Sequence, residues 1–218
     1  VGIFGVGVFI WVASDLPDPE ELWRKTDRPS ITFVDIQGQV IDRRGAPDSP
    51  PVDLKSLPVY VPQAVMAIED RKFYQHWGFD LEGVARALYV NFQEGRVVQG
   101  ASTLTQQLAK NLFLSGERTL LRKGQELVLT LLLEKLLSKQ RILEIYLNSV
   151  EWGEGVYGAE AASQHYYRKS ASKLSAYEAA RLAVMLPRPK YFETRPNSGY
   201  LSSRASTIAA RMGGVELP

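Results

Sequence analysis

The sequence predicts a mainly helical domain preceded by a short N-terminal β-hairpin. From about residue 62 onward, apolar residues recur every three or four positions, which is the spacing of one face of an α-helix. Strand-like alternation is confined to a short stretch near residues 31–41. With 218 residues, 45% of them hydrophobic, the chain is long enough for one large domain with its own core, whereas two full domains would be cramped.

Composition excludes several kinds of site. The chain has no cysteine, so a disulfide framework and a thiolate metal site are impossible, and the redox compartment cannot be inferred from cysteine usage. Two histidines are too few for a histidine-built metal site. A net charge of +2 argues against a general nucleic-acid binder. Residues 110–141 are more basic than the whole, with seven Lys or Arg against three Glu.

Residues 1–13 form an unbroken run of apolar residues and glycine. As a helix this run would span roughly 20 Å against a bilayer core of about 30 Å, too short to cross as it stands. Because the chain opens on Val rather than Met, we expect residues 1–14 to be the outer half of a transmembrane anchor. The alternatives are a signal-peptide core, for which residues 14–17 are a poor cleavage site, and a buried core helix.

Residues 15–60 read as a stalk, a hairpin and a linker. Prolines and charges fill residues 15–29, and four further prolines lie within residues 43–58. Between them, residues 31–36 and 39–41 predict two strands joined at Gln37-Gly38. A lone hairpin is marginally stable in water, so we expect it to lean on the main domain or on the membrane.

The first helices of the domain (residues 61–218) flank a charged segment at residues 69–80. A helix over residues 62–68 is expected to have Pro62 at its first position, where the missing N–H costs nothing. Asp80 is a good N-cap for the next helix, Gly95 ends it, and its apolar residues predict one buried face: Leu81, Val84, Ala85, Leu88 and Phe92. Glu69 then lies where a helix gives way to an irregular segment, which can hold a carboxylate rigidly and still expose it. A charged surface turn is the alternative.

Five further helices follow. Ser102 is the expected cap of a helix with a stripe of Leu104, Leu108 and Leu112. Residues 120–137 predict a long, largely buried helix, and Ser138 caps one that runs to residue 148. After a glycine-marked tight loop, residues 159–167 form a short helix, and Ser175 with Glu178 forms a capping box for a helix that Pro187 ends.

Two stretches carry groups suited to a phosphate. Ser102 and Thr103 open a helix, where free N–H groups attract anions, and Lys110 follows two turns later. Simple capping with solvated Gln106 and Gln107 is the alternative. On the leucine-rich helix, Glu126 stands four residues after Arg122, which predicts either a structural salt bridge or a functional carboxylate among cations. Ser170 and Lys173 match an acyl-serine pattern whose partner motifs are missing.

Five blocks in order resemble the peptidoglycan glycosyltransferases of family 51, across roughly residues 61–196. The blocks are Glu69-Asp-Arg-x-Phe-x-x-His-x-Gly-x-Asp80, Gly100-x-Ser-Thr-x-Thr-Gln-Gln-x-x-Lys110, Arg122-Lys-x-x-Glu126, Arg141-Ile-Leu-Glu-x-Tyr-Leu-Asn148 and Arg181-Leu-Ala-x-x-Leu-Pro187. Residues 151–160, and the absence of anything large after Pro196, look like the monofunctional biosynthetic transglycosylases. Gln125 is a departure, because several relatives carry a cation there.

The resemblance implies a lysozyme-like helical fold with a small membrane-proximal jaw lobe at about residues 89–114, where Phe92, Val97, Val98, Phe113 and Leu114 could touch lipid. It implies polymerisation of lipid II into glycan strands by inverting transfer, with Glu69 as the base that activates the acceptor and Glu126 on the pyrophosphate side. Substrate or pyrophosphate binding is expected of Ser102, Thr103, Gln106, Gln107, Lys110, Arg118, Arg122 and Lys123. The residues expected to shape the site are Asp70, Arg71 and His76.

The resemblance also implies a setting at the outer, periplasmic side of the bacterial cytoplasmic membrane, with a single-pass anchor. Expected partners are lipid II, the growing glycan strand, membrane lipid, and proteins of cell division or elongation, with no nucleic acid. A divalent cation, magnesium or manganese, could share the work on the pyrophosphate, and Glu126 would act there either through such an ion or by holding the cations in place. The resemblance assigns no metal ligands, and no organic cofactor is expected. The alternatives are a lysozyme-like hydrolase or lytic transglycosylase, which needs no cation cluster, and a non-catalytic membrane-anchored scaffold.

Overall fold

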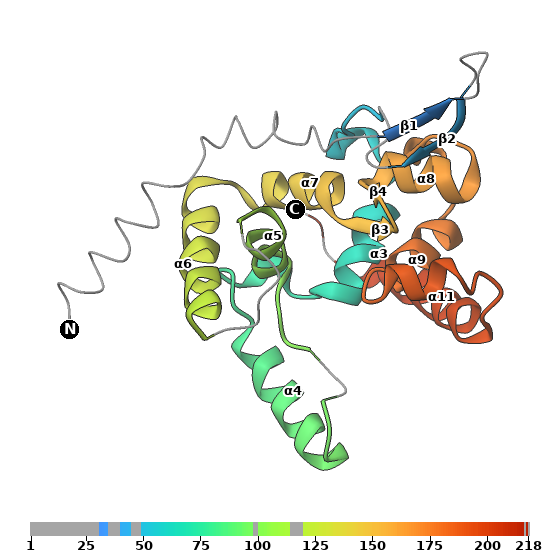
Figure 1. Cartoon of the computed structure of the whole chain (residues 1–218). Coiled ribbons are helices and arrows are strands. Elements are labelled where there is room, and N and C mark those ends of the chain that lie inside the picture. Colours follow the sequence, from blue (N-terminus) through green and yellow to red (C-terminus); the bar gives the residue numbers. More distant parts are fainter. Residues whose placement is uncertain are drawn as a thin grey trace. The chain divides into compact units, whose positions relative to one another are not determined.

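A computed structural model (Figure 1) describes residues 31–34, 40–44, 49–97, 100–113, 120–215 and 217. The chain divides into two compact units. The first contains residues 69–142, and the second contains the described parts of residues 17–68 together with residues 143–217. The expected anchor, Val98, Leu114 and Arg118 lie outside the described residues.

The expected N-terminal hairpin is present. Strands β1 (Ile31–Val34) and β2 (Val40–Arg44) pair antiparallel, with Ile31 opposite Arg44, and the register shifts between Phe33 and Val34. The second strand extends three residues beyond the expected end at residue 41. The remainder of the described chain is mainly helical, as the apolar spacing predicts.

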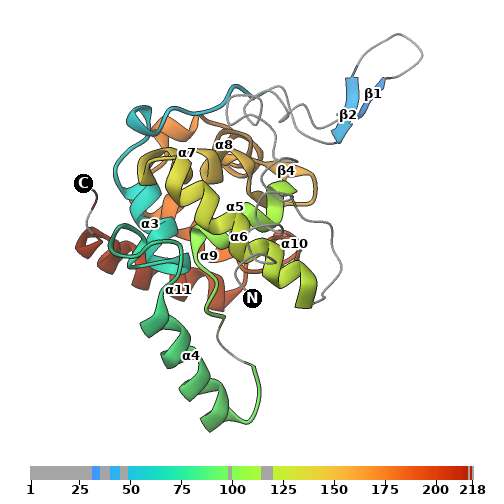
Figure 2. The same ribbon diagram turned by 90° about the vertical axis from the view of Figure 1, so that its left-hand side faces the viewer.

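The first unit contains helices α4 (Leu81–Glu94), α5 (Leu104–Phe113) and α6 (Leu120–Leu136), with the 3₁₀ turn η2 (Phe73–Gln75) before them. Asp80 caps α4 by accepting a hydrogen bond from Gly83 N at 2.9 Å, and Gly95 ends the helix in the left-handed conformation. Both caps confirm the prediction. Helix α5 packs against α6, whereas α4 projects away from both (Figures 1 and 2).

The prediction of a buried apolar face on α4 is wrong. Leu81, Leu88 and Phe92 are 77%, 66% and 86% exposed, and only Ala87 is buried. The periodic pattern correctly predicts a helix, but periodicity does not show whether a second element covers the apolar face. Because α4 projects from the unit, that face lies open.

Two other predictions about the first unit need correction. Thr103, rather than Ser102, caps α5: its hydroxyl accepts from Gln106 N at 3.3 Å, and Gln106 Oε1 accepts from Thr103 N at 3.0 Å. Helix α6 is amphipathic rather than largely buried, since Leu129, Leu132 and Leu133 are buried whereas Leu127 and Leu131 are 47% and 44% exposed. The high leucine content therefore does not show that the whole surface of this helix is buried.

The second unit holds most of the core. Its elements are η1 (Leu54–Ser56), α3 (Tyr60–Glu69), α7 (Lys139–Ser149), β3 (Glu151–Gly153), β4 (Val156–Tyr157), α8 (Ala159–Tyr167), η3 (Ala171–Lys173), α9 (Ala176–Met185), α10 (Pro189–Glu193), α11 (Gly199–Arg211) and η4 (Met212–Gly214), with α3 and α7 each crossing a unit boundary. Helix α9 opens on the predicted capping box at Ser175 and packs against α11 (Figure 1). Large buried side chains such as Tyr146, Trp152 and Leu182 fill the interior.

Helix α3 begins at Tyr60, two residues earlier than predicted. Pro62 therefore occupies the third position rather than the first. That position is still compatible with proline, because the first four N–H groups of a helix have no partner within the helix. The glycine-marked loop after α7 also differs from the prediction, since it forms the small antiparallel pair β3–β4.

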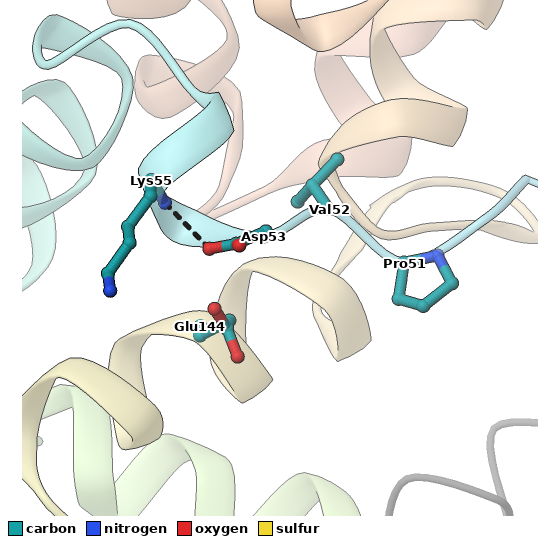
Figure 3. A pocket seen from close by; sticks show the side chains of 5 residues that line it. All are labelled: Pro51, Val52, Asp53, Lys55 and Glu144. Carbon is teal, nitrogen blue, oxygen red and sulfur yellow. Dashed lines mark hydrogen bonds between the residues drawn. The ribbon is translucent and has the colours of Figure 1, made fainter.

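The linker before α3 is tied to α7 within the second unit. Val52 N donates to Asn148 Oδ1 at 2.7 Å, Asn148 Nδ2 donates to Val52 O at 2.9 Å, and Leu54 N donates to Glu144 at 3.0 Å. A shallow pocket of about 420 Å³ lies here (Figure 3), with Glu144 of α7 facing the segment that carries Asp53. Glu144 and Asn148, two polar residues of the block Arg141–Asn148, therefore stabilise the fold by binding the backbone of the linker.

Gly78, within the charged segment, has a backbone conformation and surroundings that disfavour a side chain. Its φ is +77°, and a Cβ there would lie 2.5 Å from Thr130 Cγ2. Gly78→Ala is expected to lower the free energy of unfolding by about 3 kcal/mol, since the left-handed conformation and the overpacking each cost on the order of 1–3 kcal/mol. Urea unfolding measures the change. Gly124→Ala is the matched control: no described atom lies within 4 Å of its Cβ position in α6, so it should stabilise by about 1 kcal/mol. Equal stability of Gly78→Ala and the parent would contradict the account.

Candidate active site

Glu69 is the last residue of α3, and its two carboxylate oxygens have different surroundings. Oε2 accepts a hydrogen bond from Gln107 Nε2 of α5 at 2.7 Å. Oε1 is buried and has no hydrogen-bond partner among the described residues. One oxygen is thus fixed by the protein, while the other retains its capacity to accept a proton.

The surroundings of Glu69 raise the pKa of its carboxyl group above the ordinary value of 4.5. Burial is the main cause, because removal from water disfavours the charged form. The hydrogen bond from Gln107 and the charge of Lys110 lower this pKa, and the charge of Asp70 raises it. A carboxylate with a raised pKa is a stronger base than a solvated glutamate, which suits general-base catalysis near neutral pH.

Asp70 and His76 hold the corner next to Glu69. The Asp70 side chain is buried and accepts from His76 Nε2, which lies 2.8 Å from Oδ1. Its other oxygen accepts from Leu104 N, in the first turn of α5, at 3.0 Å. Asp70 therefore joins the corner to the helix that carries Gln107. Arg71 is exposed.

The start of α5 is occupied by contacts from the protein itself. Asp70 takes the N–H of Leu104, and the Thr103 hydroxyl donates to Gly78 O at 2.7 Å. Thr103 and Gln106 are buried and serve the capping box, whereas Ser102 is exposed. Contact of these residues with a phosphate stays a prediction. Lys110, on the exposed surface of α5, is close enough to Glu69 to affect its pKa.

Glu126 forms a second group on α6. It is 3% exposed, its Oε1 accepts from Lys123 Nζ, and its Oε2 lies 3.8 Å from Arg122 Nη1. The Lys123 side chain is 53% exposed, so its ammonium can meet solvent or a ligand while Glu126 anchors it. The predicted pairing of Arg122 with Glu126 is therefore present, and Lys123 shares it.

Two other sequence features have structural explanations. Ser170 caps η3 and its hydroxyl donates to Glu160 at 3.2 Å, so it is engaged in a turn rather than aligned with Lys173 as a nucleophile. His165 Nε2, which the proposed chemistry does not use, lies 3.2 Å from Glu193 Oε1. The sequence pattern did not single out Glu134, although a buried carboxylate on a leucine-rich helix is the same signal that marked Glu126.

Comparison with known proteins agrees with the resemblance. Residues 37–213 match the family described as Transglycosylase. A biosynthetic peptidoglycan transglycosylase of Burkholderia thailandensis is 60% identical over 156 residues, which cover 72% of this chain and 61% of that protein. Another, of Burkholderia lata, is 47% identical over 204 residues, covering 90% of this chain and 82% of that protein. The chain thus spans about three-fifths of the length of the first of these relatives. The chain belongs to the transglycosylase family.

Proposed function

We propose that this protein polymerises lipid II into peptidoglycan glycan strands and releases undecaprenyl pyrophosphate. Family membership and the names of the relatives support this activity. The observation that carries it is the asymmetry of Glu69, with Oε2 held by Gln107 and Oε1 buried without a described partner. Such a carboxylate is oriented and ready to accept a proton.

In the proposed mechanism, Glu69 Oε1 takes the proton from the 4-hydroxyl of the acceptor N-acetylglucosamine. The hydroxyl oxygen attacks the anomeric carbon of N-acetylmuramic acid at the lipid-linked end of the growing strand. The bond from that carbon to the pyrophosphate oxygen breaks, and its electron pair leaves with undecaprenyl pyrophosphate. One displacement converts the α linkage into a β linkage. Gln107 keeps Glu69 in place throughout.

The leaving pyrophosphate needs positive charge rather than a proton. Lys110 of α5 and the Arg122–Lys123 pair of α6 supply cations in the same compact unit as Glu69. Glu126 contributes by holding Arg122 and Lys123. Preorganised charges aimed at developing negative charge are often the largest single contribution to catalysis. Arg118, expected to join them, lies outside the described residues.

A divalent cation enters the proposal only as a counter-ion that the pyrophosphate carries, since Mg²⁺ often binds through substrate phosphates. Within the described ranges, no three His, Asp or Glu side chains converge to hold a metal. Both Glu126 oxygens also face cations of the protein. We therefore propose that such a cation would be held through the pyrophosphate rather than through Glu126.

Exposed apolar side chains on α4, just after it and at the end of α5 support a membrane-proximal jaw lobe at about residues 89–114. Tyr89, Phe92 and Val97 are 63%, 86% and 87% exposed, and Phe113 is partly exposed. Solvent-exposed apolar groups of this size are favourable against lipid. Within the described part of the chain, no helix has the length and apolar character needed to span a bilayer. We propose that the protein works at the outer face of the cytoplasmic membrane, where lipid II is its substrate.

Synthesis and hydrolysis can be separated directly. The protein should convert labelled lipid II into polymer and leave finished peptidoglycan intact. A lysozyme-like hydrolase or lytic transglycosylase would do the reverse. Release of soluble fragments from finished peptidoglycan, without polymer from lipid II, would contradict the proposal.

The raised pKa of Glu69 predicts the pH dependence of the reaction. A base must be deprotonated, so activity should fall as the pH drops through a pKa above 4.5. Because the Gln107 hydrogen bond lowers this pKa, Gln107→Ala should shift the acid limb of the kcat/KM profile to higher pH. Gln75→Ala, at an exposed position of η2, is the control and should leave the limb in place. A shift of the Gln107→Ala profile to lower pH would refute this assignment.

A further inference from the structure

Glu134 is a buried carboxylate that the mechanism above does not use. It lies near the end of α6, and its side chain is 4% exposed. Its Oε1 accepts a hydrogen bond from Thr105 Oγ1 at 2.5 Å and lies 2.7 Å from Lys139 Nζ. A buried charge is costly unless it is paired and hydrogen-bonded, and here both conditions are met by residues from two other helices.

Thr105 connects Glu134 to the helix that holds Glu69. It lies in the first turn of α5, two residues before Gln107, and is fully buried. The same turn is tied to the Glu69 corner through Leu104 N and Asp70, and through the Thr103 hydroxyl and Gly78 O. The Thr105–Glu134 hydrogen bond joins this turn to α6, in addition to the packing of α5 against α6. Gln107 lies one turn or less from all three hydrogen bonds.

Glu134 and its partner Lys139 also lie close to residues 69–80. Lys139 Nζ, paired with Glu134, lies 4.4 Å from the centroid of the buried Phe73 ring. A Cβ on Gly78 would lie 3.2 Å from Glu134 Cγ, so the backbone of the segment packs closely on this side chain. The Glu134 side chain thus bonds to the start of α5 and the start of α7, and it packs close to the backbone of Gly78.

We propose that Glu134 is a positioning residue for the transfer reaction. Through Thr105 and Lys139 it holds α5 against residues 69–80, so that Gln107 keeps Glu69 Oε1 directed at the acceptor hydroxyl. The proposal rests on the proposed function, because it assigns Glu134 a role in the same proton transfer. A displacement of about 1 Å at a catalytic group can cost on the order of 10² in rate, so a support beneath the base matters.

Thr105→Val gives the cleanest test, because it removes one hydroxyl and keeps the volume of the side chain. With labelled lipid II as substrate, kcat should fall about tenfold while KM changes less than twofold, and the acid limb should move to higher pH, as in Gln107→Ala. Glu134→Gln should act in the same direction. Glu82→Gln, which removes a carboxylate from the exposed pair with Lys72, is the matched control and should keep parent kinetics.

The double variant Thr105→Val/Gln107→Ala separates positioning from mere stability. If Thr105 and Glu134 act through Gln107, the double variant should be no slower than Gln107→Ala alone. The inference would be overturned if the reductions in kcat of the two single variants multiply in the double variant, or if folded Thr105→Val keeps the kcat of the parent. If Glu134→Gln does not fold, the kinetics of Thr105→Val still test the inference. A separate measurement tests the proposed function itself: if Glu69→Gln polymerises lipid II at the parent rate, Glu69 is not the base.

Discussion

Glu69→Gln should reduce lipid II polymerisation by a factor on the order of 10²–10⁴, the usual contribution of an aligned general base. The amide keeps the shape of the side chain and can still contact Gln107, but it cannot take a proton from the acceptor hydroxyl. KM should change little, since the substitution removes an interaction that matters in the transition state. Single-turnover polymerisation of labelled lipid II measures the loss.

The Glu69→Gln variant should remain folded. Burial raises the pKa of Glu69, which means that the charged form is disfavoured in the folded state, so a neutral amide relieves that penalty at neutral pH. The melting temperature should therefore stay at or above that of the parent. A variant that polymerises lipid II at close to the parent rate would show that another group takes the proton.

Glu126→Gln should be the second most damaging substitution, with kcat falling by a factor on the order of 10². Glu126 is 3% exposed and holds Lys123 and Arg122, so an amide leaves two neighbouring cations without the anion that orients them. The cost in stability should be smaller than for a fully buried pair, because the Lys123 side chain is 53% exposed. Steady-state kinetics with lipid II, alongside thermal unfolding, measures both effects.

The pH profile of Glu126→Gln should distinguish this variant from substitutions at or near Glu69. Glu126 acts on the leaving-group side in our account, so Glu126→Gln should lower the plateau of the rate and leave the acid limb where it is in the parent. Glu82→Gln again serves as the control, since it removes a surface carboxylate paired with Lys72. An unchanged plateau, or a shifted acid limb in Glu126→Gln, would remove Glu126 from the pyrophosphate side.

Local sequence signals predicted the ends of several helices correctly. Asp80 and Gly95 bound α4, Ser138 caps α7 by accepting from Arg141 N, and the Ser175–Glu178 capping box opens α9. These signals work because capping depends on a few neighbouring residues. The prediction that Ser102 caps α5 was wrong because Ser102 and Thr103 are both good capping residues. The Thr103 hydroxyl also donates to the carbonyl of Gly78, which is distant in sequence and which local signals do not reveal.

Tertiary surroundings were harder to predict. The apolar stripe of α4 was expected to be buried, yet Phe92 is 86% exposed, because a pattern does not reveal whether a partner covers it. Helix α11 was not predicted, although buried Leu201, Ala205 and Ile208 recur at helical spacing. At the proposed site, the motifs single out Glu69 and Glu126, whose roles stay predictions, whereas the Thr105–Glu134–Lys139 contacts join three helices and carry no local signature.

If Glu69 is the base, its own carboxyl group must titrate together with the activity. Carbon-13 NMR of protein labelled at the glutamate carboxyl carbons, with the Glu69 resonance assigned by its absence in Glu69→Gln, would give its pKa alongside the pH profile of lipid II polymerisation. We predict a pKa above 4.5 that coincides with the midpoint of the acid limb. A Glu69 pKa at or below 4.5, or one separated from that midpoint, would contradict the account.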